Sequence, residues 1–298
     1  MVRFHGCPQL MQPKEKQPNL ETIQRVGIAA LKKAYRVHEE LGDSGIELLK
    51  KNQFGDTALR ADVEVEEAVL SVLRDSGLPI TVFSEEHGKV QLGEETQYTG
   101  VLDGIDGSSW YKSERGKGRY GTMFAIFAGK DPTYGDYQFS GIMEHATKRL
   151  FYAVKGKGAF IMDVQTGAII PIHTAQATAL DKGTRVHIDE YWEINRQTFL
   201  SKLQGYNVQK YNRCSSVHYA NVAMGQADLA LECTRKGNLE IAAAHGLIVE
   251  AGGDMISLDG DKVADKKFLE FAQDTHAPII TAATRELAIS TMAFLKAS

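Results

Sequence analysis

Cysteine is scarce in this 298-residue sequence, which contains only Cys7, Cys214 and Cys233. These three lie far apart, are odd in number and form no C-x-x-C pair, so neither a disulfide framework nor a zinc site is indicated. Long apolar runs are also missing, and no stretch approaches the roughly 18 apolar residues that a membrane span needs. Residues 1–18 are polar and lack the apolar segment of a secretory signal. We therefore expect a cytoplasmic protein without a membrane partner.

An excess of positive charge is absent as well. The chain has 34 Lys and Arg against 38 Asp and Glu, a formal net charge of −4, which argues against a nucleic-acid polymer as its partner. Neither a glycine-rich dinucleotide fingerprint after a first strand nor a P-loop is present. The apolar and charged fractions, 43% and 24%, are those of an ordinary globular protein. The length allows one large domain or two packed subdomains.

Hydrophobic periodicity predicts helices and strands that alternate along most of the chain. Apolar residues recur at spacings of three and four between Asn19 and Leu41, with Asn19 as the candidate N-cap. A second helix is predicted to start at Asp62, whose carboxylate is a candidate N-cap. The further predicted helices are 191–203, 215–224, 239–250 and 284–295. The predicted strands are 80–83, 98–102, 122–128, 137–143, 149–154, 159–162, 185–188, 208–211, 227–231, 255–258 and 278–283.

These elements, mostly joined by short loops, are typical of a layered α/β protein. We expect residues 1–18 to form a flexible N-terminal arm and residues 19–298 to form a single domain. A polar, turn-rich stretch at residues 164–184 places the boundary between two subdomains there, giving subdomains of about 19–175 and 176–298.

One short stretch, Asp103-Gly104-Ile105-Asp106-Gly107-Ser108, is the first candidate site. Strand 98–102 leads into it, and the Asp-Gly pairs predict a tight turn followed by a helix start. Mg²⁺ and Ca²⁺ prefer oxygen ligands, and two carboxylates on one turn can share them. Backbone N–H groups at a helix start can bind a phosphate. An ordinary β-turn is the alternative interpretation.

Further carboxylates follow predicted strands or open predicted helices. They are Asp62, Glu85, Glu232 and Glu240. Five or six carboxylates cannot converge in a folded protein unless cations neutralise them. If they converge, two or three Mg²⁺ ions are the expected occupants, and hydrolysis of a phosphate ester is the expected chemistry.

Several motifs in this order resemble the inositol monophosphatase family over roughly residues 20 to 290. The motifs are D-x₅-D-x₃-E (Asp56, Asp62, Glu66), S-E-E-H-G (84–88), L-D-G-I-D-G-S (102–108) and L-E-I-A-A-A-H-G-L-I-V-E-A-G-G (239–253). The resemblance implies a layered α-β-α-β-α sandwich, a homodimer, and Mg²⁺-dependent hydrolysis of a small phosphate monoester. An inositol or sugar phosphate is the preferred substrate, with fructose 1,6-bisphosphate and 3′(2′),5′-nucleotide bisphosphates as alternatives.

The resemblance also implies a set of metal ligands. Glu85, Asp103 and the carbonyl of Ile105 would hold a first Mg²⁺. Asp103, Asp106 and Glu240 would hold a second, and Glu85 would also contact a weaker third ion.

The implied catalytic residues are Asp62, Ser108 and Glu85. Asp62 and Ser108 match the carboxylate–hydroxyl pair that orients and deprotonates the attacking water. The N–H groups of Gly107 and Ser108 would bind the phosphate, and Glu232 would bind a hydroxyl of the leaving alcohol.

The chain also departs from the family pattern. Gly104 stands where most relatives have proline, and Glu240 replaces an aspartate, with one apparently extra residue between Glu232 and Glu240. The basic segment 112–119 is either a solvated loop or, through Arg115, Lys117 and Arg119, a site for a second anionic group of the substrate. These departures keep open a function of another class, a metal- and phosphate-binding protein with little catalytic activity.

Overall fold

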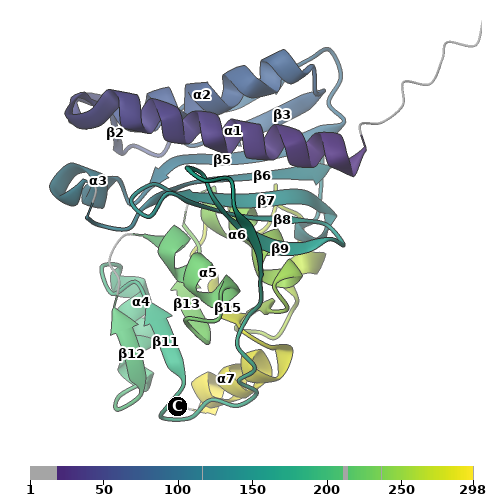
Figure 1. Ribbon diagram of the computed structural model, residues 1–298. Helices are drawn as coiled ribbons and strands as arrows, with labels where there is room; N and C mark the ends of the chain where they lie inside the picture. The colour runs from purple at the N-terminus through teal and green to yellow at the C-terminus, as the bar shows by residue number, and fades with distance from the viewer. Residues whose placement is uncertain (1–18, 116, 211–213, 236, 298) are drawn as a thin grey trace, which may run out of the picture.

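A computed structural model describes residues 19–297 except 116, 211–213 and 236. The predicted arm 1–18, Gly116 of the basic segment and Tyr211 of a predicted strand lie outside the described residues. Within them, five layers alternate between helices and sheets (Figure 1). Helices α1 and α2 cover one face of an eight-stranded sheet, α5 and α6 lie between that sheet and a five-stranded sheet, and α7 packs on the far side. The predicted α/β class and its layered sandwich are confirmed.

The larger sheet has the strand order β10-β9-β8-β7-β6-β5-β3-β4, in which only β3 and β5 pair in parallel. Its strands are β3 (Ile80–Ser84), β4 (Gly88–Leu92), β5 (Tyr98–Asp106), β6 (Gly121–Ala128), β7 (Tyr137–Glu144), β8 (Arg149–Val154), β9 (Gly158–Asp163) and β10 (Ile169–Ile172). A separate hairpin pairs β1 (Leu48–Lys51) with β2 (Thr57–Leu59).

The smaller sheet has the order β12-β11-β13-β15-β14. Its strands are β11 (Arg185–Ile188), β12 (Asn207–Lys210), β13 (Leu229–Cys233), β14 (Asp254–Ser257) and β15 (Pro278–Ala282). The larger sheet thus uses strands up to Ile172 and the smaller one starts at Arg185. The predicted division of the domain near residue 175 stays a prediction.

The seven α-helices found among the described residues are α1 (Leu20–Leu41), α2 (Arg60–Ser76), α3 (Ser108–Glu114), α4 (Glu193–Thr198), α5 (Ser215–Ala223), α6 (Leu239–Glu250) and α7 (Arg285–Ala297). Short 3₁₀ helices occupy Gly42–Ile46, Tyr134–Asp136, Leu200–Lys202 and Val263–Asp265. None of the described helices is long and apolar enough to cross a membrane.

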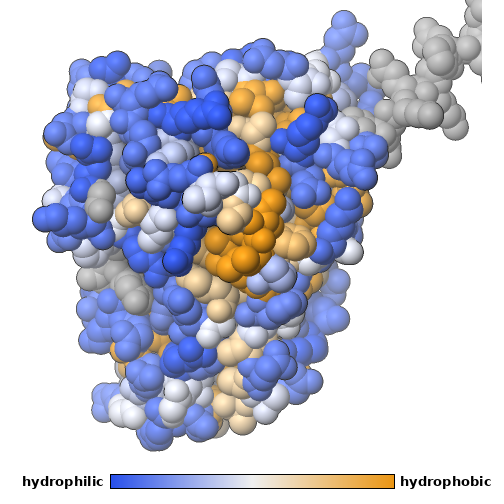
Figure 2. All heavy atoms as spheres, viewed as in Figure 1, coloured by the Kyte–Doolittle hydropathy of each residue, from blue (hydrophilic) through white to orange (hydrophobic). Residues whose placement is uncertain are grey.

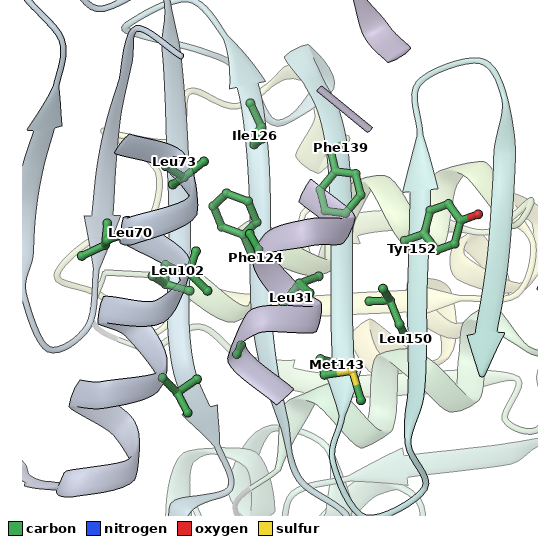
Figure 3. Close-up of a cluster of buried hydrophobic side chains, with 14 of the residues drawn as sticks. Leu31, Leu70, Leu73, Leu102, Phe124, Ile126, Phe139, Met143, Leu150 and Tyr152 are labelled. Atoms are coloured by element: carbon green, nitrogen blue, oxygen red, sulfur yellow. The ribbon is translucent and has the colours of Figure 1, made fainter. Parts of the chain in front are cut away.

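Helix α1 shows how the sequence builds the first layer. The Asn19 side chain accepts a hydrogen bond of 2.9 Å from the N–H of Thr22, so the predicted N-cap is confirmed. The periodic apolar side chains, Leu31 among them, pack against the large sheet beside Phe124 and Phe139 (Figure 3). A Cβ on Gly27 would lie 2.6 Å from the Phe139 ring, so only glycine permits this close approach of helix and sheet.

Several boundaries differ from the predictions. Helix α2 begins at Arg60 rather than Asp62, and the predicted helix 191–203 is reduced to α4 and a 3₁₀ turn. Strands β4 and β10 were not predicted: both are short, β4 begins with glycine and contains polar residues, and β10 contains Pro171, which cannot donate a hydrogen bond to a sheet.

Strand β10 is an edge strand whose Ile169 and Ile170 are 49% and 58% exposed. Figure 2, drawn in the same view as Figure 1, shows an apolar area on the face of the molecule that is turned toward the viewer. Exposed apolar edges are frequent sites of protein contact, and the homodimer stays a prediction.

Truncation of Leu31 tests the contribution of the first layer to stability. We expect Leu31→Ala to lower the free energy of unfolding by about 2–5 kcal/mol, because it leaves a cavity between α1 and the sheet. Urea denaturation measures the change. Lys33→Ala, on the exposed side of the same helix, is the matched control, and equal effects of the two substitutions would contradict this account of the packing.

Candidate active site

Strand β5 carries the first two carboxylates of the site. The strand does not end at Leu102, as predicted, but continues to Asp106, with an irregular register against β6 between Asp103 and Asp106. The predicted tight turn at Asp103–Gly104 is therefore wrong: pairing with β6 keeps this stretch extended. The chain turns at Gly107, whose φ is +93°, and α3 then starts at Ser108 as predicted. Both aspartates are buried.

Gly104 allows helix α2 to approach β5. A Cβ at this position would lie 2.6 Å from the carbonyl oxygen of Asp62 and 2.8 Å from Cγ of Glu66. Asp62 occupies the third position of α2, where its Oδ2 accepts a 2.8 Å hydrogen bond from the N–H of Leu59. Its N-cap role is thus corrected to that of a first-turn carboxylate that bonds back to the residue before the helix. The other oxygen, Oδ1, is buried, and no described residue forms a hydrogen bond with it.

Glu66, one turn further along α2, fixes the segment that carries Glu85 and Glu86. Its carboxylate accepts hydrogen bonds of 3.0 Å from the N–H groups of both residues, and it also contacts the Ser84 hydroxyl and Nδ1 of His87. Sequence reasoning gave Glu66 no role in the site. The signal was its place in the D-x₅-D-x₃-E spacing, which puts it on the same face of the helix as Asp62.

Helix α6 brings Glu240 to the two aspartates. Each of Asp103, Asp106 and Glu240 offers a carboxylate oxygen, and these oxygens lie within 4.8 Å of one another. Glu240 lies in the first turn of α6, two residues after the N-cap residue Asn238, which is buried and has a left-handed conformation with φ of +49°. Residues almost 140 positions apart in the chain therefore meet, as the predicted second ligand set requires.

These residues surround a pocket of about 280 Å³. Among the described residues its wall holds seven carboxylates and a single guanidinium, that of Arg235. The full wall consists of Asn52, Asp56, Thr57, Asp62, Glu85, Glu86, Asp103, Ile105, Asp106, Gly107, Ser108, Ser109, Tyr191, Trp192, Arg235 and Glu240.

The donor set fits hard divalent cations. Oxygen is the ligand atom that Mg²⁺ prefers. The wall supplies carboxylates from α2, β5 and α6 and from the segments before β2 and after β3, and it also includes Ile105. Oδ1 of Asp103 is buried and has no hydrogen-bond partner among the residues that the structure describes. Such an unsatisfied carboxylate oxygen in the middle of other carboxylates is costly unless a cation contacts it.

Arg235 was missed by sequence reasoning. Its Nη2 lies 2.8 Å from Oε1 of Glu240 and 3.3 Å from Oδ1 of Asp106, and it donates a 2.6 Å hydrogen bond to the hydroxyl of Ser215. The guanidinium also lies 5.9 Å from the centre of the Trp192 ring. A lone arginine in a turn between a strand and a helix carries no pattern that would have identified it.

A family model described as the inositol monophosphatase family matches residues 17–293. The chain belongs to the inositol monophosphatase family. It is accordingly a phosphomonoesterase of that family, which confirms the predicted membership and enzyme class.

Individual relatives and solved structures agree with this membership. A curated relative from Methanothermobacter thermautotrophicus, named fructose-1,6-bisphosphatase/inositol-1-monophosphatase, is 26% identical over 226 residues, which are 72% of this chain and 75% of that protein. The extragenic suppressor protein SuhB from Bartonella henselae has a TM-score of 0.74 at 19% identity over 92% of this chain and 98% of its own. The inositol monophosphatase of Thermotoga maritima has a TM-score of 0.72 at 16% identity, over 92% of this chain and 97% of its own.

Four of the predicted functional residues of this family member do not line the pocket. Glu232 lies behind it and accepts a 2.8 Å hydrogen bond from the hydroxyl of Ser215. Arg115 pairs with Asp43 at 2.9 Å. Arg119 donates to the buried carboxylate of Glu144 at 2.6 Å and to Asn221 at 2.8 Å. Lys117 is exposed. The remaining predicted site residues all contribute to the pocket wall.

Crowded and buried carboxylates resist ionisation. Burial, together with the nearby carboxylates of Glu85 and Asp106, raises the pKa of Asp103 well above its ordinary value. Burial likewise raises the pKa of Glu86 to about 7 and that of Glu232 to about 8, although Arg235 opposes the latter shift. Divalent cations would therefore compete with protons for these oxygens.

This competition predicts a pH-dependent stability of the metal-free protein. Glu232 titrates near 8 when folded and near its ordinary 4.5 when unfolded, so the native state binds more protons between these values. The free energy of unfolding then falls as pH rises. Buried histidines such as His187, with its pKa lowered to about 4, act in the opposite direction below about pH 6.5. The net fall is expected between pH ~6.5 and ~8.5.

Thermal denaturation in a chelator checks this prediction, and Mg²⁺ should raise Tm more at the upper end of the range than at the lower. Glu232→Gln, which stays neutral, should flatten the fall. A Tm that rises with pH over this range in the metal-free protein would contradict the assignment.

Gly104→Ala tests the close contact between β5 and α2. The new methyl group would meet the Asp62 backbone, so we expect a loss of about 1–3 kcal/mol in stability and a lower kcat, because Asp62 must move. Gly183→Ala is the matched control, since a Cβ there comes no closer than 3.4 Å to a neighbour. Urea denaturation and phosphate release measure the two effects. An alanine tolerated equally at both positions would rule the contact out as a constraint.

Proposed function

We propose that this family member hydrolyses a small phosphate monoester, an inositol or sugar phosphate, in a Mg²⁺-dependent reaction. The observation that carries the proposal is the convergence of seven carboxylates on one 280 Å³ pocket, in which Oδ1 of Asp103 lacks a hydrogen-bond partner within the described part of the chain. Such a pocket is electrostatically incomplete without divalent cations.

The proposed ligands are Glu85, Asp103 and the Ile105 carbonyl on one side, and Asp103, Asp106 and Glu240 on the other. Two or three ions are proposed in all. When bound, Mg²⁺ would lower the pKa of water and stabilise the charge that develops on the phosphoryl oxygens.

Asp62 and Ser108 are proposed to handle the attacking water. Both line the pocket, from α2 and from the start of α3. In this scheme the Ser108 hydroxyl orients the water and Asp62, with an unpartnered Oδ1, accepts its proton. The water oxygen forms the new bond to phosphorus, the ester P–O bond breaks, and the leaving alkoxide takes up a proton to become the alcohol. The N–H groups of Gly107 and Ser108 would bind the transferred phosphate.

The positions of Arg115 and Arg119 bear on how many phosphate groups the substrate carries. Arg115 and Arg119 have acidic partners outside the pocket, so the earlier hypothesis that they bind a second phosphate has no structural support. This favours a monophosphate over a sugar or nucleotide bisphosphate. The name of the Methanothermobacter relative includes both fructose 1,6-bisphosphate and inositol 1-phosphate hydrolysis, so both substrates belong in the test.

Asp103→Asn tests the proposal directly. We expect release of phosphate from inositol 1-phosphate to require Mg²⁺ and to fall by more than about 100-fold, since even groups that only orient a metal ligand cost about 10- to 100-fold. Asp274→Asn, at an exposed aspartate away from the pocket, is the matched control. A parallel assay with fructose 1,6-bisphosphate and a 3′,5′-nucleotide bisphosphate compares the substrate classes. Tight phosphate binding without turnover would instead favour the metal- and phosphate-binding protein.

A further inference from the structure

The carboxylates proposed to hold the two metal ions differ in how far a positive charge of the protein already offsets their negative charge. On the side of Glu85 and Asp103, neither carboxylate forms an ion pair with a described residue, and the buried Oδ1 of Asp103 has no hydrogen-bond partner among those residues. On the other side, a single guanidinium nitrogen of Arg235 contacts Asp106 at 3.3 Å and Glu240 at 2.8 Å. One positive charge is therefore already present between two of the three residues that would hold the second Mg²⁺.

Hydrogen bonds of residues before and after Arg235 fix the position of its backbone. Just before Arg235, the hydroxyl of the buried Thr234 donates a hydrogen bond to the carbonyl of Thr275, and the N–H of Thr234 donates to the carbonyl of Ala277. After it, Gly237 and Asn238 both have positive φ, and the N–H of Asn238 donates to the carbonyl of Arg235 at 3.0 Å. Glycine adopts a positive φ at no steric cost, whereas at Asn238 the left-handed conformation costs free energy and persists because the surroundings fix it.

The guanidinium itself is fixed by neutral groups as well as by charge. It donates to Ser215, which in turn donates to Glu232, and the Trp192 ring lies against its outer side. An arginine side chain keeps its proton in proteins, so changes of pH do not remove this charge. Only movement of the side chain can free the carboxylate oxygens that it contacts.

We propose that Arg235 is a built-in cation that competes with the second divalent metal ion for Asp106 and Glu240. The inference rests on the metal site of the proposed function, and it concerns the second ligand set alone. The ion on the Glu85–Asp103 side binds first, because among the described residues no cationic side chain forms an ion pair with Glu85 or Asp103, whereas Arg235 pairs with Asp106 and Glu240. Binding on the other side requires the guanidinium to leave the two carboxylates, which weakens that step.

Titration with Mn²⁺, followed by calorimetry and by electron paramagnetic resonance of the free ion, tests this competition. The wild-type full-length chain should show a tight step and a weak step. Arg235→Gln should tighten the weak step by about tenfold, which corresponds to about 1.4 kcal/mol, and leave the tight step unchanged. Arg74→Gln removes the same charge from an exposed ion pair on α2 and should behave as the wild type.

Two further variants keep the test decisive. Arg235→Lys retains the charge without the planar fork and should give a weak step between those of the wild type and Arg235→Gln. If Arg235→Gln fails to fold, as judged by circular dichroism, the lysine variant decides. In a Trp110→Phe background, Trp192 is the remaining tryptophan, and its fluorescence should change with the weak step of a Mg²⁺ titration.

The possible results separate this inference from the proposed function. Two steps that are identical in the wild type, Arg74→Gln and Arg235→Gln overturn the inference and leave the metal-dependent phosphatase standing. A weaker second step in Arg235→Gln also overturns it, because Arg235 would then support the ligands instead of competing. Absence of Mn²⁺ binding in every variant overturns both.

Discussion

Mutual repulsion of buried carboxylates is the constraint on which the rest of this structure depends. Like charges held a few ångströms apart away from water are stable only if protons, cations or hydrogen-bond donors offset them. The fold uses all three: raised pKa values at Asp103 and Glu86, the Arg235 guanidinium at Asp106, and backbone N–H groups around Glu66. Together, these protons, cations and hydrogen-bond donors allow carboxylates from strands and helices distant in sequence to lie around one pocket.

Much of the fold could be predicted from the sequence, because its strongest signals are local. Helix α1 follows from its period and its Asn19 cap, and the strands at 80–84 and 149–154 from their apolar runs. The ligand motifs were found because ligand sites are common where strands end at the C-terminal edge of a sheet. Their convergence was inferred from the resemblance, and the 4.8 Å grouping of Asp103, Asp106 and Glu240 agrees with it.

What could not be predicted depends on contacts between distant segments. Asp-Gly normally signals a turn, yet pairing of Asp106 with Gly121 extends β5 through it. The basic segment suggested a second anion site, but Arg115 and Arg119 have acidic partners that no local pattern reveals. Arg235 could not be predicted as a site residue, because its place in the site depends on ion pairs with Asp106, which is far away in the sequence, and with Glu240 across a turn.

Helix α2 carries two carboxylates one turn apart, and they serve different parts of the site. Asp62 faces the pocket directly, whereas Glu66 holds the backbone of Glu85 and Glu86. A small displacement of α2 along its axis would therefore shift the group proposed to accept the proton and a proposed metal ligand in the same direction. One helix fixes the spacing between Asp62 and Glu66. A shift of α2 relative to the sheet therefore moves both side chains together and preserves the geometry between them.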